Sequence, residues 1–555
     1  MTRVFSYLSL LLIVFLFLPL AGLLVSSFYS TDISGSGSFG TENYQIASEI
    51  VGNLDALGWS VAFAAGSALL ATVMGTATAW LFQRTDIPFR RSILILTLVP
   101  MFIPGVIYTY SWILLTSPEI GLLNKLIRLT GQQSPLDIYS FAGMVWVDGI
   151  KSAPMVVLIV GAMLRSFDPQ QEMAARLAGA SIPKIFFSIT CPLLLPAIGA
   201  SFLLLFIRGI GTFETPAMLG GPIGIELLSY NVYRAFLDYP LSTGPVAASS
   251  MPLLLLALFL VFIHERLVKP RNYQISKAYS VETSARLLMG SARIPLGAGF
   301  LLLSIAVSVL PLSVVFWSSL NPYFIQPSLE SLGNLSFEAY REIFASSRVA
   351  DASVLTLKLS GIAATAIVAA GIIMAWVMER TRHVTASFIE PSVDTLLAVP
   401  GIIIGLAILV LHTRFDTGLY GTSTLLFLVY LTKHLPQGLR FVRAGLAQVP
   451  QDLEQAARCS GAGETRVLTR ITIPLMVPAA FAGWLYVITL CARDLSGALL
   501  LYSPGEEVLS VLLWQYWESG QIMQLSALSM LFLLPLVIVA AVVRFITKET
   551  GFSHA

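Results

Sequence analysis

The sequence predicts an all-α integral membrane protein of about twelve transmembrane helices, arranged as two parallel six-helix repeats. The chain is strongly apolar, its apolar stretches have the length of a bilayer crossing, and one polar segment between these stretches occurs twice. In hydrocarbon every backbone polar group needs an internal partner, so apolar stretches of this length must be helices.

The composition excludes a soluble protein. Of the 555 residues, 56% are hydrophobic and only 12% are charged, and the mean hydropathy is +0.80. Soluble domains carry about 25% charged residues. The net charge of +2 gives no basic field for nucleic acid, which we do not expect as a partner. The three cysteines and five histidines have neither disulfide nor metal-ligand spacing, so no metal site is expected.

Twelve stretches are long enough to cross a bilayer, which takes about 20 apolar residues. They lie at about 5–27, 58–82, 92–116, 139–163, 192–214, 245–264, 295–319, 354–378, 388–412, 423–442, 474–499 and 527–547. The first follows Arg3 and could be a signal peptide. It is longer than a usual signal core and no clear cleavage site follows it, so we expect a membrane helix.

The basic residues predict the orientation. If the N-terminus is cytoplasmic, 22 of the 33 Lys and Arg residues lie on the cytoplasmic side and 6 on the outer side. Cytoplasmic loops carry an excess of Lys and Arg, so both termini are expected in the cytoplasm. Four tryptophans are expected in the interfacial belt: Trp59, Trp80, Trp112 and Trp317.

An internal repeat divides the chain. Residues 1–265 are expected to form a first six-helix half, 266–294 a basic cytoplasmic linker, and 295–555 a second half. A shift of 282 residues superimposes Glu-x-Ala-Ala-Arg at 172–176 on the same pattern at 454–458, together with later glycines, threonines and prolines. Because six crossings preserve polarity, the halves are parallel repeats about an axis along the membrane normal.

The repeated segment predicts a compact helix–turn–helix. Asp168 and Pro169 are typical of a helix start, and Gly179 is expected to end the short helix. A second short helix begins near Pro183. Glu172 and Arg176 are four residues apart and are expected to pair on one face. Small alanines would let another protein approach closely, and two such loops suit a two-fold partner.

These residues resemble the EAA loop of permeases in binding-protein-dependent ABC importers, here at about 168–196 and 450–478. The resemblance implies a type I importer permease fold, and docking of these loops on a cytoplasmic ATPase. The residues that would couple the two proteins are Glu172, Ala174, Ala175, Arg176, Gly179, Ala180, Glu454, Ala456, Ala457, Arg458, Gly461 and Ala462.

The sequence contains no phosphate-binding loop, so the chain itself is expected not to be an enzyme. The resemblance implies a transport subunit in the bacterial inner membrane. Its partners would be two copies of an ATPase, which carry the ATP and Mg²⁺, a periplasmic or lipid-anchored solute-binding protein, and membrane lipid. No cofactor is expected on this chain.

The double-length chain resembles the ferric-iron permease branch, which makes ferric iron the leading substrate. The segment Arg493-Asp494-Leu495-Ser496 departs from the Glu-Leu-Pro sequence motif of that branch, which counts against ferric iron but not against a transporter. Thiamine, 2-aminoethylphosphonate and polyamine remain alternatives. An ion-coupled secondary transporter, or a channel or scaffold, is an alternative of another class, although the duplicated loop argues against both.

Charged residues within spans are costly and are therefore functional candidates. The candidates for the pathway are Asp148, Lys151, Lys433, Glu214 and Asp494. Asp148 and Lys151 are three residues apart and could pair, and the alternative for both is a purely structural role. Pro100, Pro104 and Pro400 are expected to kink the third and ninth spans, which makes these spans candidate pathway helices.

Overall fold

The computed structural model describes residues 2–31, 37–50, 54–132, 136–238, 243–268, 286–325, 327, 330–381, 383–415 and 417–549. Helices dominate the described chain. Its one sheet is an antiparallel hairpin of β1 (Tyr29–Thr31) and β2 (Gly37–Phe39). The predicted all-α class is confirmed.

The chain forms two compact units that do not follow the two predicted halves. Unit 1 comprises residues 1–53, 231–258 and 337–555, and unit 2 comprises 54–230 and 259–336. Unit 1 thus joins the first helix of the chain to the later helices, and unit 2 includes the first helix after the predicted linker. The halves at 1–265 and 295–555 stay a prediction about the sequence repeat. Residues 269–285 of the linker lie outside the described residues.

Unit 2 is built on helices α3, α7 and α10, which pack against one another. Its elements are α3 (Leu54–Arg84), α4 (Arg90–Leu98), η1 (Val99–Phe102), α5 (Gly105–Thr116), α6 (Leu122–Leu129), α7 (Phe141–Ser166), α8 (Gln170–Leu177), α9 (Ile182–Ile185), η2 (Phe186–Thr190), α10 (Cys191–Ile210), η3 (Pro216–Gly220), η4 (Gly221–Ile223), η5 (Gly290–Ala292), α13 (Arg293–Ser319) and η6 (Glu330–Asn334).

Unit 1 repeats this core with helices α15, α18 and α21. Its elements are the β1–β2 hairpin, α1 (Thr2–Ser27), α2 (Glu42–Ile50), α14 (Glu338–Ala345), α15 (Ser347–Arg380), α16 (Ala386–Ala398), α17 (Gly401–Arg414), α18 (Ser423–Ala447), α19 (Gln451–Cys459), α20 (Glu464–Val467), η7 (Leu468–Thr472), α21 (Ile473–Ala492), α22 (Leu509–Glu518) and α23 (Ile522–Glu549). Helices α11 (Leu228–Asp238) and α12 (Thr243–Val268) pass from one unit into the other.

Eight helices of the described chain are long and apolar enough to cross a membrane, and two bent pairs bring the number to ten. The chain is therefore an integral membrane protein. The two remaining predicted spans fall on α18 and α23. Helix α18 carries Lys433, Arg440 and Arg443 within its 25 residues, which lowers its hydropathy, and α23 contains a shorter apolar segment, Ile522–Pro535.

The predicted kinks in the third and ninth spans are confirmed as sharp breaks. The segments Arg90–Phe102 and Gly105–Thr116 meet at 112°, and Ala386–Ala398 and Gly401–Arg414 meet at 101°. Pro104 and Pro400 are the residues before α5 and α17, with extended backbone (ψ 146° and 140°) that the preceding helix cannot continue through.

The expected interfacial belt is wrong for two of its tryptophans. Trp80 and Trp112 are only 8% and 5% exposed, whereas Trp59 is 40% exposed. The ring of Trp80 packs edge-on against Phe186, with the ring centroids 4.9 Å apart. The apolar area of these large side chains is buried between helices instead of against lipid headgroups.

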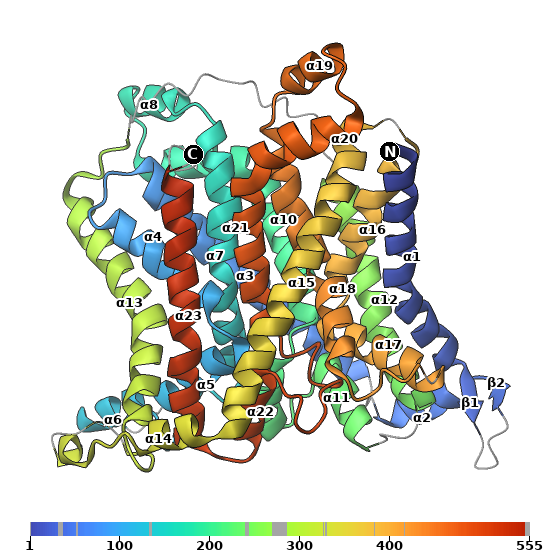
Figure 1. Ribbon diagram of the computed structural model, residues 1–555. Helices are drawn as coiled ribbons and strands as arrows, with labels where there is room; N and C mark the ends of the chain where they lie inside the picture. The colour runs from blue at the N-terminus through green and yellow to red at the C-terminus, as the bar shows by residue number, and fades with distance from the viewer. Residues whose placement is uncertain are drawn as a thin grey trace. The chain divides into compact units, whose positions relative to one another are not determined.

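Within unit 1 the start of α1 and the segment α19–α20 lie at one end, and the β1–β2 hairpin and α22 lie at the other (Figure 1). The N-terminus of the chain and the second copy of the repeated motif are therefore at the same end of this unit, as the predicted orientation requires.

Candidate functional site

The two copies of the repeated motif fold alike, as helix–turn–helix loops. In the first, Gly179 has a φ of +86° and separates α8 from α9. In the second, Gly461 has a φ of +81° and separates α19 from α20. Glycine adopts this left-handed conformation at little cost, and it ends the preceding helix. The backbone N–H of Ala180 donates to the Ala175 carbonyl at 3.0 Å, and Ala462 donates equally to Ala457.

The first loop begins slightly later than predicted. Helix α8 starts at Gln170, with Pro169 as the preceding residue, and Asp168 Oδ1 accepts from the Gln170 N–H at 2.9 Å. Pro183 lies in the first turn of α9, as expected. Each loop then continues through a single π-helical turn, η2 or η7, into the next long helix. The helix–turn–helix prediction is confirmed.

The motif glutamate of the first loop is buried, and its partners are not the predicted one. Its carboxylate forms an ion pair with Arg84, with Nε–Oε2 at 3.3 Å, and accepts from the Thr190 hydroxyl at 2.5 Å. Arg176 instead donates to the Ala180 carbonyl at 3.0 Å. The predicted pairing of Glu172 with Arg176 is wrong because α8 turns its glutamate inward while Arg176 stays exposed.

The second loop repeats this arrangement with the equivalent residues. Arg380 Nε donates to both oxygens of Glu454, at 3.2 and 3.0 Å, and the Thr472 hydroxyl donates to the same carboxylate at 3.0 Å. The side chains of Arg380 and Glu454 are 7% and 1% exposed. We call each set of Arg, Glu and Thr a clasp: Arg84–Glu172–Thr190 and Arg380–Glu454–Thr472.

Each clasp connects its loop to all three core helices of its unit. Arg84 ends α3 and also donates to the carbonyls of Leu164 and Phe167 at the end of α7, while Thr190 directly precedes α10. Arg380 does the same at the ends of α15 and α18, through the carbonyls of Leu446 and Val449. Breaking a buried ion pair of this kind costs about 3–5 kcal/mol, so each loop and its helix core should move as one body.

The outer faces of the loops are small and exposed. Ala174 and Ala456 are exposed, as are the two glycines, and a Cβ on either glycine would meet nothing within 4 Å. The inner alanines are half-buried: Ala175 and Ala180 pack against the core of unit 2, and Ala457 and Ala462 pack near Trp376 in unit 1.

Around these faces the two loops differ. Leu177 at the end of α8 is 88% exposed, and the equivalent residue in the second loop is the exposed Cys459. Arg458 forms an ion pair with Glu464 at 2.8 Å, and the hydrogen bond to this carboxylate raises the pKa of Arg458.

In unit 1 the predicted pathway charges form one buried network. Lys433 Nζ donates to Asp494 Oδ1 at 2.7 Å and to the Ser496 hydroxyl at 3.0 Å, and His434 Nε2 lies 3.2 Å from Asp494 Oδ2. The Lys433 ammonium also covers the first residue of α17, because a Cβ on Gly401 would collide with it. The network therefore ties the broken span α16–α17 to α18 and to the segment after α21.

Unit 2 gathers its predicted pathway charges around the equivalent glycine. A Cβ on Gly105, the first residue of α5, would lie 2.7 Å from Lys151 Nζ and 2.8 Å from Glu214 Cδ. Asp148 is buried and interacts electrostatically with Lys151, Arg208 and Glu214. Asp148 thus belongs to a cluster of four charges, of which Lys151 is one member.

Sequence reasoning missed the arginines of the clasps and His434. Arg84 and Arg380 are among the 22 basic residues that predict the orientation. A further sign is that Ala79-Trp80 and Arg84-Thr85 recur as Ala375-Trp376 and Arg380-Thr381. This second repeat has an offset of 296 residues instead of 282, so a single shift of the chain does not detect it. His434 has no equivalent in the first copy, where Ser152 occupies the place, and the repeat could not have indicated it.

The described residues contain no cluster of side chains that would suit a bound metal ion. No three His, Cys, Asp or Glu side chains of the described residues are placed to hold a metal ion.

Comparison with known proteins agrees with the duplicated architecture. The family described as the inner membrane component of binding-protein-dependent transport systems matches residues 67–273 and 367–548. The chain belongs to this family. Each match contains one motif loop, two of the core helices that its clasp connects, and the later part of the third, because the matches begin inside α3 and α15. The residues that recur between the two copies are therefore those of a permease repeat.

The chain is similar to several known permease proteins, two of them over most of its length. The chain is 23% identical over 490 residues to the Fe(3+)-transport system permease protein FbpB 2 of Haemophilus influenzae, covering 86% of each chain. It is 22% identical over 533 residues to the ferric transport system permease protein FbpB of Actinobacillus pleuropneumoniae, covering 93% of this chain and 74% of that one. The trehalose/maltose permease MalF of Thermococcus litoralis is 30% identical over 186 residues, covering 32% of this chain and 62% of that one.

Proposed function

We propose that this permease is the transmembrane subunit of an ATP-driven importer that passes ferric iron from a solute-binding protein to the cytoplasm. The observation that carries the proposal is the pair of clasped loops, one in each family match. Each presents a small exposed face outside the membrane-spanning helices and is tied by a buried carboxylate to three of those helices.

The clasps suggest how ATP hydrolysis on another chain would drive transport. One copy of a cytoplasmic ATPase docks on each loop, against Ala174, Gly179 and their equivalents Ala456 and Gly461. Movement of the ATPase then displaces the loop, and the clasp transmits the displacement to α3, α7 and α10 or to α15, α18 and α21. This chain has no catalytic role and binds no cofactor, and ATP and Mg²⁺ belong to the ATPase.

The broken spans and their charged clusters are the proposed pathway elements. Lys433 with Asp494, and Lys151 with Asp148 and Glu214, fix the first residues of α17 and α5. Alternating access requires these segments to change position as one six-helix repeat rocks against the other. The clusters would then act as latches that hold one state and rearrange in the other.

Ferric iron is proposed as the substrate because the relatives named for ferric iron match the largest share of this chain among those compared above. The relatives named for ferric iron match 86% and 93% of the chain, whereas the sugar permease matches 32%. The binding protein, soluble or lipid-anchored on the outer side, would carry most of the selectivity. Both termini are placed in the cytoplasm, on the excess of Lys and Arg in the loops of that side. Thiamine, 2-aminoethylphosphonate and polyamine importers are the alternatives within the same class.

Reconstitution tests this function. The chain is placed in liposomes with its native ATPase and binding protein, and uptake of radioactive iron is measured with and without ATP. We expect ATP-dependent uptake only with ferric-loaded binding protein. The double variant Ala174→Trp/Ala456→Trp should abolish uptake, whereas Ala369→Trp, on the exposed face of α15, should retain it. Uptake that follows an ion gradient without ATP would contradict the importer, and stimulation by thiamine-loaded protein alone would contradict iron.

A further inference from the structure

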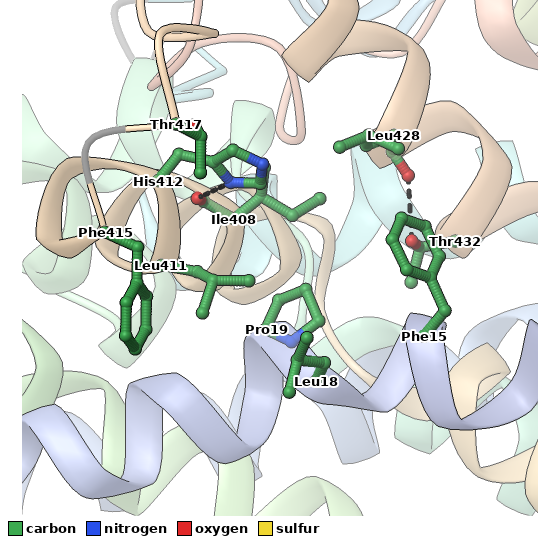
Figure 2. A pocket seen from close by; sticks show the side chains of 10 residues that line it. All are labelled: Phe15, Leu18, Pro19, Ile408, Leu411, His412, Phe415, Thr417, Leu428 and Thr432. Atoms are coloured by element: carbon green, nitrogen blue, oxygen red, sulfur yellow. Dashed lines mark hydrogen bonds between the residues drawn. The ribbon is translucent and has the colours of Figure 1, made fainter.

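An apolar pocket of about 400 Å³ lies in unit 1 between α1, α17 and α18 (Figure 2). Its wall contains Phe15, Leu18 and Pro19 from α1, and Ile408 and His412 from α17. Ligand pockets have volumes of about 300–1,000 Å³, so the space suits a small organic molecule. Phe15 and Leu18 are 47% and 50% exposed, and Phe15 is near the middle of a membrane span, so the molecule would enter from the bilayer.

The other unit shows what fills the equivalent space. Helix α13 packs on α5 in unit 2 as α1 packs on α17 in unit 1, and Leu310-Pro311-Leu312 repeats Leu18-Pro19-Leu20. In α5, Tyr108 and Trp112 are 0% and 5% exposed. A cavity of about 20 Å³ beside α13 is lined by Ile150 and Val307, among other residues, and by no residue of α5.

Both aromatic residues are missing from unit 1. Counted from the first glycine of each helix, Tyr108 of α5 corresponds to Ile404 of α17, and Trp112 corresponds to Ile408. Two large rings are thus replaced by two branched aliphatic side chains. Ile408 lines the pocket directly. The smaller side chain at Ile408, in place of the Trp112 ring, therefore accounts for open space beside α17.

Tyr108 also donates a hydrogen bond that Ile404 cannot donate. Its hydroxyl donates to the Val307 carbonyl at 2.9 Å. Val307 is four residues before Pro311, and proline has no N–H, so this carbonyl lacks its helical donor. In α1 the corresponding carbonyl is that of Phe15, four residues before Pro19. Phe15 and Pro19 both line the pocket, so the carbonyl that lacks its helical donor belongs to a pocket-lining residue.

The other polar groups around the pocket are acceptors as well. His412 Nδ1 lies 2.8 Å from the Ile408 carbonyl and must carry the proton there, which leaves Nε2 of the neutral ring as an acceptor. The Thr432 hydroxyl donates to the Leu428 carbonyl at 2.8 Å, as the dashed lines in Figure 2 show. Ester-linked acyl chains offer no donor to these groups, whereas a hydroxyl does.

We propose that this pocket binds a phenol-headed apolar molecule of the membrane, the class to which prenylated hydroquinones belong. The ring occupies the space that Tyr108 and Trp112 fill in unit 2, and the hydroxyl donates to the Phe15 carbonyl. The bound molecule would wedge α1 against the broken span α16–α17. The site is independent of the proposed transport substrate.

Two probes that differ in one hydroxyl test the proposal. Saturable binding of tritiated 4-octylphenol is measured on the full chain in nanodiscs, with empty nanodiscs as the blank, and octylbenzene is the competitor. We expect about one site per chain and a roughly three- to tenfold preference for the phenol, the value of one net hydrogen bond. Equal binding of both probes, or no saturable binding, would overturn the proposal.

Variants that place the aromatic residues of unit 2 at the equivalent positions of unit 1 test where the probe binds. Ile408→Trp fills the pocket and should abolish saturable binding. Ile404→Tyr supplies the hydroxyl from the protein and should remove the preference for the phenol, which keeps the test valid if the tryptophan variant does not fold. Tyr108→Phe, in the other unit, should leave binding unchanged. Undiminished binding in both isoleucine variants would place the probe elsewhere and overturn the assignment.

Discussion

Replacing Glu454 by glutamine should loosen the second loop far more than the same change at Glu464. Both glutamates lie in the second loop and accept from an arginine, but the Arg380–Glu454 pair is 7% and 1% exposed and the Arg458–Glu464 pair is 36% and 42% exposed. Glutamine keeps the size of the side chain and removes its charge. In Glu454→Gln, Arg380 therefore stays buried without its counter-charge.

The burial of each pair sets the expected magnitude. Removing one partner of a buried ion pair costs about 3–5 kcal/mol, whereas an exposed pair contributes about 0–1 kcal/mol. At about 1.4 kcal/mol per factor of ten, opening of the loop should become roughly a hundredfold to a few thousandfold more frequent in Glu454→Gln. In Glu464→Gln it should change by less than about fivefold.

Hydrogen exchange measures this opening directly. Amide exchange of peptides from residues 451–472 is followed by mass spectrometry for the wild type and both variants, since local opening free energies are read from exchange rates. Peptides from the first loop serve as an internal reference and should not change. Similar acceleration in both variants, or none in Glu454→Gln, would refute the view that the buried carboxylate fixes the loop.

Three further predictions concern the charged networks and one further carboxyl. Lys433→Met should abolish uptake, because Asp494 stays buried without its cation. Adding Asp494→Asn removes this unpaired charge, so the double variant should regain thermal stability more than it regains uptake. Gly401→Val should destabilise the chain by about 1–3 kcal/mol, because its side chain collides with Lys433, and Gly299→Val, which points into open space, is the control for unfolding measurements. Outside these networks, Glu518 at the end of α22 accepts from the Tyr233 hydroxyl at 3.1 Å, and burial raises its pKa. The contribution of this carboxyl to stability is therefore present below its ordinary pKa and is lost as pH rises through the raised value. Glu518→Gln should flatten the fall of the unfolding temperature with rising pH in that range, and an unchanged pH profile would contradict this assignment.

The repeat could be predicted from sequence because its residues are close in the chain. The shift of 282 residues aligned both loops, and local rules for glycine and proline gave their helix–turn–helix form. The broken spans followed from Pro104 and Pro400 in the same way. These features depend on backbone preferences within a few residues, which composition and spacing express directly.

The features that sequence reasoning missed depend on contacts between distant segments. The i, i+4 rule paired Glu172 with Arg176, but the carboxylate instead turns toward Arg84, which is 88 residues earlier in the chain. A buried carboxylate gains more from a buried arginine and a threonine hydroxyl than from an exposed neighbour on its own helix. Nothing in the local pattern shows which face of α8 is covered.

Local sequence patterns also could not predict which helices pack together in each unit. Helix α1 belongs to the unit of α15, α18 and α21, and α13 belongs to that of α3, α7 and α10. Hydropathy identifies α1 and α13 as membrane helices but does not show which helices they contact. His434 was missed because it occurs in only one copy of the repeat.

The number of ATPase chains bound per permease tests the central claim most directly. The tagged chain is purified in mild detergent with its native ATPase, and the complex is weighed by native mass spectrometry for the wild type, for Ala174→Trp, for Ala456→Trp and for the double variant. Two ATPase chains on the wild type, one on each single variant and none on the double variant are the predicted result. Two ATPase chains retained by the double variant would contradict the assignment of both loops as the docking sites.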